Sequence, residues 1–158
     1  MTQSIVVGLA TIALSTLGQG QPRLTGDWSM DPSRSASAVQ NEPIQSKTLR
    51  ITEAEDTLTI DRTTDERSFT TRYRRASPGA PVFRADGFHG IFYWDGPRLV
   101  TETAGNVSDK TVRTRETYTI DSVQDELVVE TVAIVEHGYA VRGGRNYATG
   151  QDVYLRRR

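Results

Sequence analysis

The sequence predicts an all-β fold, and three observations lead to that prediction. Beyond residue 43, most segments alternate polar and apolar residues with the two-residue period of a β-strand. These segments are rich in Thr, Val, Tyr and Ile, which favour strands over helices. Most links between them are short, as antiparallel neighbours allow. We therefore predict a single antiparallel up-and-down barrel, or a barrel-like sandwich, of about 8–9 strands.

The predicted strands follow one another along most of the chain. They cover residues 24–30, 48–52, 57–61, 67–74, 88–94, 98–103, 111–121, 126–135 and 153–156. Polar residues 53–56 and 122–125 are predicted hairpin turns, and residues 77–81 break the pattern because two prolines cannot lie inside a paired strand. Residues 31–43 are predicted as an exposed connection with at most one short helix. Residues 136–151 have no sustained period and are predicted as a loop.

The first 20 residues differ from the rest in carrying no charged side chain. Their apolar run, residues 5–17, is shorter than the ~20 residues that a spanning helix needs. We expect residues 1–20 to be a secretory signal peptide and residues 24–157 to form the barrel domain, in a secreted or periplasmic protein without an integral membrane segment. A native amphipathic or buried N-terminal helix is the alternative.

Composition narrows the chemistry that the domain can perform. Cysteine is absent, so disulfides and thiolate catalysis are excluded. The 19 basic and 20 acidic residues are interleaved, which disfavours nucleic-acid binding because no basic stripe results. His89 and His137 lack the spacing of metal ligands, so neither a metal nor another cofactor is expected. We expect a monomer or a weak homodimer.

Several short motifs resemble those of a known class of barrel. The opening Gly26-Asp-Trp-Ser-Met-Asp-Pro-Ser-Arg-Ser35 resembles the Gly-Thr-Trp-x-x-Asn-x-x-Lys-Ser of small bacterial exported lipocalin-like proteins, which belong to the wider calycin class. Residues 56–60, residues 93–99, the hairpin of residues 117–130 and the final residues 153–156 resemble their later strands. The resemblance covers residues 24–157 and implies a lipocalin-like barrel.

The same resemblance assigns structural roles at one end of the barrel. It implies that Trp28, two residues after Gly26, lies at the closed end near an arginine of the last strand. In this sequence that arginine is Arg156 or Arg157. A guanidinium over an indole contributes ~0.5–2 kcal/mol beyond apolar burial.

Strand parity predicts which polar side chains face inward. With Leu58 and Ile60 inside, Arg62 shares their face, and Glu116 shares the face of Tyr118 on a later strand. Arg62 and Glu116 would then form an internal couple, because a charge inside a barrel must be paired or solvated. Both side chains could instead lie at hydrated strand ends.

The same reasoning gives a candidate ligand site of Tyr73, Thr101, Glu116 and Tyr118. Thr101 and Tyr73 would provide hydroxyls and Tyr118 apolar area, as a small organic ligand requires. Glu116 would provide the one charge that could orient a donor group of the ligand or exchange a proton. If Glu116 had no partner, burial would favour its protonated form, and binding would vary with pH above ~4.3. The alternative is that these side chains fill a narrow barrel.

Three functions are consistent with the sequence. The leading hypothesis is an exported barrel that binds a small apolar or amphipathic molecule. The second is an enzyme with Glu116, Tyr73 and one histidine as acid–base groups in the barrel mouth. The third is a filled barrel that binds a protein partner through an exposed face or strand edge.

Overall fold

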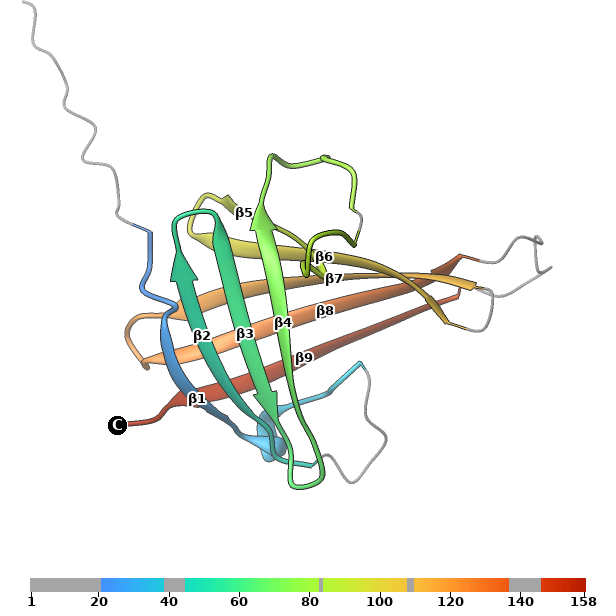
Figure 1. Ribbon diagram of the computed structural model, residues 1–158. Helices are drawn as coiled ribbons and strands as arrows, with labels where there is room; N and C mark the ends of the chain where they lie inside the picture. Colours follow the sequence, from blue (N-terminus) through green and yellow to red (C-terminus); the bar gives the residue numbers. More distant parts are fainter. Residues whose placement is uncertain (1–20, 39–44, 83, 108–109, 137–145) are drawn as a thin grey trace, which may run out of the picture.

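The protein is a closed β-barrel in which each strand pairs with its neighbours along the chain (Figure 1). The computed structural model describes residues 21–38, 45–82, 84–107, 110–136 and 146–158, so the predicted signal peptide and His137 lie outside the described residues. The barrel strands are β1 (Gly26–Met30), β2 (Thr48–Ala54), β3 (Thr57–Thr63), β4 (Ser68–Arg75), β5 (Gly90–Asp95), β6 (Arg98–Val107), β7 (Lys110–Asp121), β8 (Glu126–Glu136) and β9 (Tyr147–Arg156). The prediction of an all-β barrel is confirmed, and the sandwich alternative is not observed.

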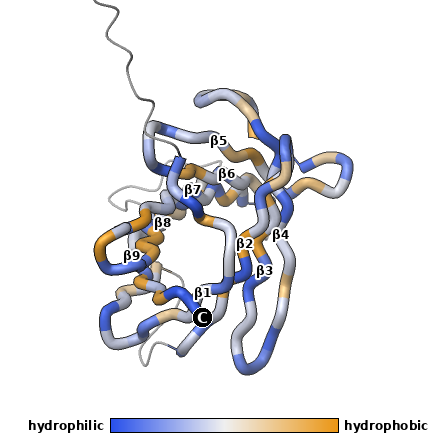
Figure 2. The backbone as a smooth tube through the Cα atoms, turned by 90° about the vertical axis from the view of Figure 1, so that its left-hand side faces the viewer, coloured by the Kyte–Doolittle hydropathy of each residue, from blue (hydrophilic) through white to orange (hydrophobic). Residues whose placement is uncertain are grey.

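Alternation of inward and outward side chains builds the core, as predicted from the two-residue period. In the view of Figure 2 the strands form a ring, and hydrophobic and hydrophilic residues alternate along them. The inward set includes Ile51, Leu58, Ile60, Phe92, Leu99, Tyr118 and Leu127, each no more than 1% exposed. In the described part of the connection after β1, residues 31–38, there is one short 3-10 helix, η1 (Pro32–Arg34), as the prediction allows.

One pair of neighbouring strands departs from the antiparallel arrangement. β4 and β5 run parallel, and their register comprises only three pairs, from Tyr73 with Gly90 to Arg75 with Phe92. The intervening residues 76–89, which begin with the proline-rich break, return along the barrel before β5 starts. Consequently residues 68–72 of β4 pair with β3 but with no described strand on their other side.

The loop prediction for residues 136–151 is wrong at its C-terminal part. β9 begins at Tyr147 and pairs with β8 over its whole length, from Ile134 with Tyr147 to Glu126 with Leu155. Gly150 weakened the strand pattern in the sequence, because glycine is uncommon inside strands. It lies where residues 36–38 cross the inner face of β9, and a Cβ atom there would collide with the backbone of Ala36 and Ala38.

Trp28 and Arg156 close one end of the barrel. The Trp28 side chain is fully buried, and the Arg156 guanidinium lies 4.1 Å from the centre of its ring. The indole N–H donates to the Leu24 carbonyl at 3.0 Å, and Arg156 donates to the carbonyls of Arg23 and Thr25. Gly26 has φ +146°, and a Cβ atom there would lie 2.8 Å from Arg156 Nη1. The spacing Gly-x-Trp therefore gives the arginine room to cover the ring.

No helix among the described residues is long and apolar enough to span a membrane.

Candidate functional site

A cavity of about 770 Å³ lies inside the barrel, away from the end closed by Trp28. Its apolar wall consists of Leu49, Phe69, Val112 and Val129 together with the rings of Tyr73, Tyr118 and Tyr154. Threonine hydroxyls cover much of the remaining wall, from Thr64, Thr71, Thr103, Thr114 and Thr131. The volume falls within the ~300–1,000 Å³ range of small-molecule sites. The barrel is therefore hollow rather than filled on this side.

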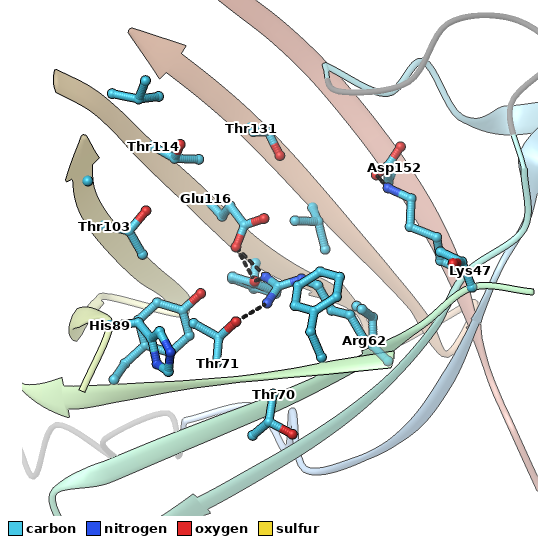
Figure 3. Close-up of a pocket in the computed structure, with 18 of the residues that line it drawn as sticks. Lys47, Arg62, Thr70, Thr71, His89, Thr103, Thr114, Glu116, Thr131 and Asp152 are labelled. Carbon is cyan, nitrogen blue, oxygen red and sulfur yellow. Dashed lines mark hydrogen bonds and ion pairs between the residues drawn. The ribbon is translucent and has the colours of Figure 1, made fainter. Parts of the chain in front are cut away.

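An ion pair between β3 and β7 occupies the centre of the cavity wall (Figure 3). Arg62 Nη2 lies 2.5 Å from Glu116 Oε2 and also donates to the Tyr118 hydroxyl at 2.8 Å. Arg62 Nη1 donates to the Thr71 hydroxyl at 3.3 Å. Tyr118 in turn donates to Glu116 Oε2 at 2.6 Å. The predicted inward couple of Arg62 and Glu116 is thus present, and the alternative of hydrated strand ends is not.

The electrostatics of this cluster favour the charged pair. Burial by itself would lower the pKa of Arg62, but the negative charge of Glu116 and then the phenol of Tyr118 outweigh it, so the pKa lies well above its ordinary value. Burial raises the pKa of Tyr118 well above its ordinary value, and burial raises that of Tyr73 as well. Both phenols therefore act as neutral hydrogen-bonding groups at physiological pH.

The structure brings three of the four predicted site residues to the cavity. Tyr73, Glu116 and Tyr118 line it, whereas Thr101 does not. Thr101 is 1% exposed and pairs with Glu116 across β6 and β7, and its hydroxyl donates to the Glu116 carboxylate at 3.4 Å. The premise that Glu116 is buried without a partner is also wrong, because Arg62 provides one. The pH dependence predicted from a protonated Glu116 loses its basis for that reason.

A second ion pair at the cavity wall was not predicted. Lys47 Nζ lies 3.0 Å from Asp152 Oδ2, and both also contact the Ser37 hydroxyl at 3.4 Å. The other carboxylate oxygen of Asp152 is buried and has no hydrogen-bond partner among the described residues. Parity could have found both residues, because Lys47 continues the inward series of Leu49 and Asp152 that of Tyr154.

His89 lines the cavity next to the parallel strand pair. Its Nδ1 accepts from the Arg72 backbone N–H at 3.1 Å, and the backbone N–H of His89 donates to the Arg72 carbonyl at 2.7 Å. The side chain thus caps the edge of β4 just beyond the last strand pair. Among the described residues, no group of three or more His, Cys, Asp or Glu side chains could hold a metal ion.

Comparison with known proteins gives the fold. A scan against protein-family models finds no matching model, and a search of curated proteins finds no match. Among solved structures, the wild-type fluorescent protein UnaG is similar with a TM-score of 0.51 and 16% identity, over 85% of this chain and 97% of that one. The protein has a calycin-type β-barrel fold.

Two further solved structures have similar TM-scores and identities to this chain. A single-site variant of UnaG has a TM-score of 0.50 and 14% identity, over 85% of this chain and 96% of that one. A fatty-acid-binding protein from brain tissue of Drosophila melanogaster has a TM-score of 0.49 and 16% identity, over 82% and 95%. At these identities the calycin-type likeness concerns the fold alone.

Proposed function

We propose that the protein binds a small amphipathic molecule inside its barrel. The observation that carries the proposal is the cavity of about 770 Å³, which is bounded by apolar side chains and hydroxyl groups. Such a combination suits a ligand that buries an apolar body and fixes its orientation with a few hydrogen bonds. A barrel filled by its own side chains would offer no such volume, so the cavity favours ligand binding over the partner-binding alternative.

The polar cluster in the cavity restricts which part of a ligand can reach it. Arg62 already donates to Glu116, Tyr118 and Thr71, and Glu116 neutralises its charge. A ligand carboxylate at this point would meet the Glu116 carboxylate and would have to displace it from Arg62, at the cost of a buried uncompensated charge. The interior therefore suits an apolar chain and uncharged polar groups.

Acid–base catalysis by Glu116 and Tyr73 receives less support from the same geometry. A general base near neutral pH must be free to accept a proton. The Glu116 carboxylate instead accepts from Arg62, Tyr118 and Thr101. Binding is therefore the function that this arrangement supports best.

We also propose that the protein is exported, on the basis of the uncharged leader and its short apolar run. Ligand binding does not depend on this location.

Displacement of an uncharged fluorescent dye tests the binding proposal. Nile red, whose emission increases in apolar surroundings, should bind the purified protein and be displaced by dodecan-1-ol. Thr114→Phe places a ring in the cavity and should abolish dye binding, whereas Thr119→Phe, on the outer face of the same strand, should not. Equal dye binding by both variants, with near-ultraviolet circular dichroism showing both folded, would refute binding inside the barrel.

A further inference from the structure

The charged side chains that line the cavity do not cancel. They are Lys47, Arg62, Arg84, Glu116 and Asp152. Lys47 pairs with Asp152 and Arg62 pairs with Glu116, which leaves Arg84 as the remaining charge. Within the described part of the chain, Arg84 has no acidic side chain at ion-pair distance, and the residue is exposed. The cavity therefore carries one uncompensated positive charge at a solvent-accessible position.

Arg84 lies at the side of the barrel, where the strand pairing is incomplete. It belongs to residues 76–89, which connect the parallel strands β4 and β5. Its Nη1 lies 3.9 Å from the position that a Cβ atom would occupy on Gly105 of β6. The cavity touches Thr70 and Thr71 on the β4 side of this region and Gly105 and Asn106 on the β6 side. Arg84 thus lies at the cavity beside the incompletely paired residues 68–72 of β4, and we call this side of the cavity the lateral opening.

The main chain at this opening adds a hydrogen-bond donor. In an antiparallel pair, the N–H and C=O of every second residue point to the same edge of the strand. Those of Arg72 point away from β3, toward His89. Those of Thr70, two residues earlier, therefore point to the same edge and face the opening, where β4 has no described strand partner. An acceptor group beside Arg84 could receive a bond from this N–H group.

We propose that this lateral opening is an anion subsite in which Arg84 binds the acidic head group of an amphipathic ligand, while the apolar chain extends into the cavity. The proposal rests on the proposed binding function and specifies the orientation and class of the ligand. The head group lies at the side of the barrel and not against Arg62, because Arg62 is neutralised by Glu116 and Arg84 is not. A carboxylate at Arg84 keeps contact with water, so it avoids most of the desolvation penalty of an interior site.

Two ligands with the same chain separate the head group from the tail. Dodecanoic acid, ionised at neutral pH, and dodecan-1-ol are each used to displace Nile red from the wild type and its variants. The wild type should bind the acid more tightly than the alcohol. Arg84→Gln should weaken binding of the acid by about two- to fivefold, the range of an exposed charge pair, and leave the alcohol unchanged. Arg84→Glu should weaken the acid further, and added salt should reduce the difference between wild type and Arg84→Gln.

Arg98→Gln is the matched control, because it removes the same charge from an exposed arginine that pairs with Asp95 and does not line the cavity. It should leave the affinity for both ligands unchanged. The anion subsite is wrong if Arg84→Gln and Arg84→Glu bind the acid as the wild type does, or if acid and alcohol weaken equally. If neither ligand displaces the dye from the wild type, the binding function itself fails and the subsite with it.

Discussion

The guanidinium of Arg62 and the carboxylate of Glu116 form an ion pair inside the barrel, with 2.5 Å between Nη2 and Oε2. The two side chains come from β3 and β7, which are not neighbours in the barrel. The Arg62 and Glu116 side chains are 12% and 19% exposed, and both line the cavity. The pair therefore links opposite walls and determines which polar groups a ligand meets in the interior.

Breaking this pair should destabilise the protein. Arg62→Met or Glu116→Gln should each lower the free energy of unfolding by about 2–4 kcal/mol, because each leaves a largely buried charge without its partner. The double variant should lose less than the sum of the two, since it leaves no charge behind. Chemical denaturation of the four proteins measures the coupling. The exposed pair Arg98 and Asp95, treated in the same way, should couple by ~1 kcal/mol or less. Additive effects for Arg62 and Glu116 would show that the pair contributes nothing.

Alkaline pH should destabilise the barrel through its buried tyrosines. Burial raises the pKa of Tyr73, Tyr118 and Tyr154 above the ordinary value of 10.0. The unfolded chain therefore releases these protons first, and stability falls as pH rises above about 10. Titration by ultraviolet absorbance should show that these phenols ionise only as the chain unfolds. The denatured protein, in which all 6 tyrosines are solvated, should titrate in a single step near the ordinary pKa. The same single step in the folded protein would contradict the burial of the three rings.

Removal of the Trp28 ring should be among the more destabilising single changes. Trp28→Ala deletes a fully buried indole and its contact with Arg156, and should cost ~3–5 kcal/mol. Trp94→Ala should cost less, because Trp94 is only partly buried and its N–H bonds to Glu53. Denaturant midpoints give the comparison. A larger loss for Trp94 than for Trp28 would rule out the closing role of Trp28.

Export predicts a processed N-terminus. Protein expressed in a Gram-negative host should be recovered from the periplasm or medium, with its first residue between positions 19 and 24. N-terminal sequencing of the purified protein measures this directly. Cytosolic protein that retains Met1 would contradict it.

Much of the architecture could be predicted because the alternation of polar and apolar residues indicates both the strands and the side chains that face inward. The period-two patterns of β3 and β7 predicted that Arg62 and Glu116 face inward, and the resemblance to lipocalin-like barrels implied the contact of Trp28 with Arg156 or Arg157. Thr101 also has the correct parity, but parity predicts only the face of the sheet and not whether a side chain reaches the cavity. Thr101 is fully covered beside its strand partner Glu116, so it donates to that carboxylate and does not line the cavity.

Other features depend on contacts that a local pattern does not contain. The parallel pairing of β4 with β5 follows from the path of residues 76–89, and residues 76–87 of this segment carry no strand period. The start of β9 is determined by pairing with β8 and by the crossing of residues 36–38 over Gly150. Arg84 lies in an irregular segment, and only the two ion pairs elsewhere in the cavity show that its charge is uncompensated.

The central claim is that a small amphipathic molecule binds inside the barrel, and nuclear Overhauser effects test it most directly. Isotope-labelled dodecanoic acid bound to the protein should give effects from its chain to the methyl groups of Leu49, Val112 and Val129, which line the cavity. Exposed Val132 and Ile134, on the outer face of β8, should show none. Effects confined to Val132 and Ile134, or none to the three cavity residues at saturating ligand, would contradict the account.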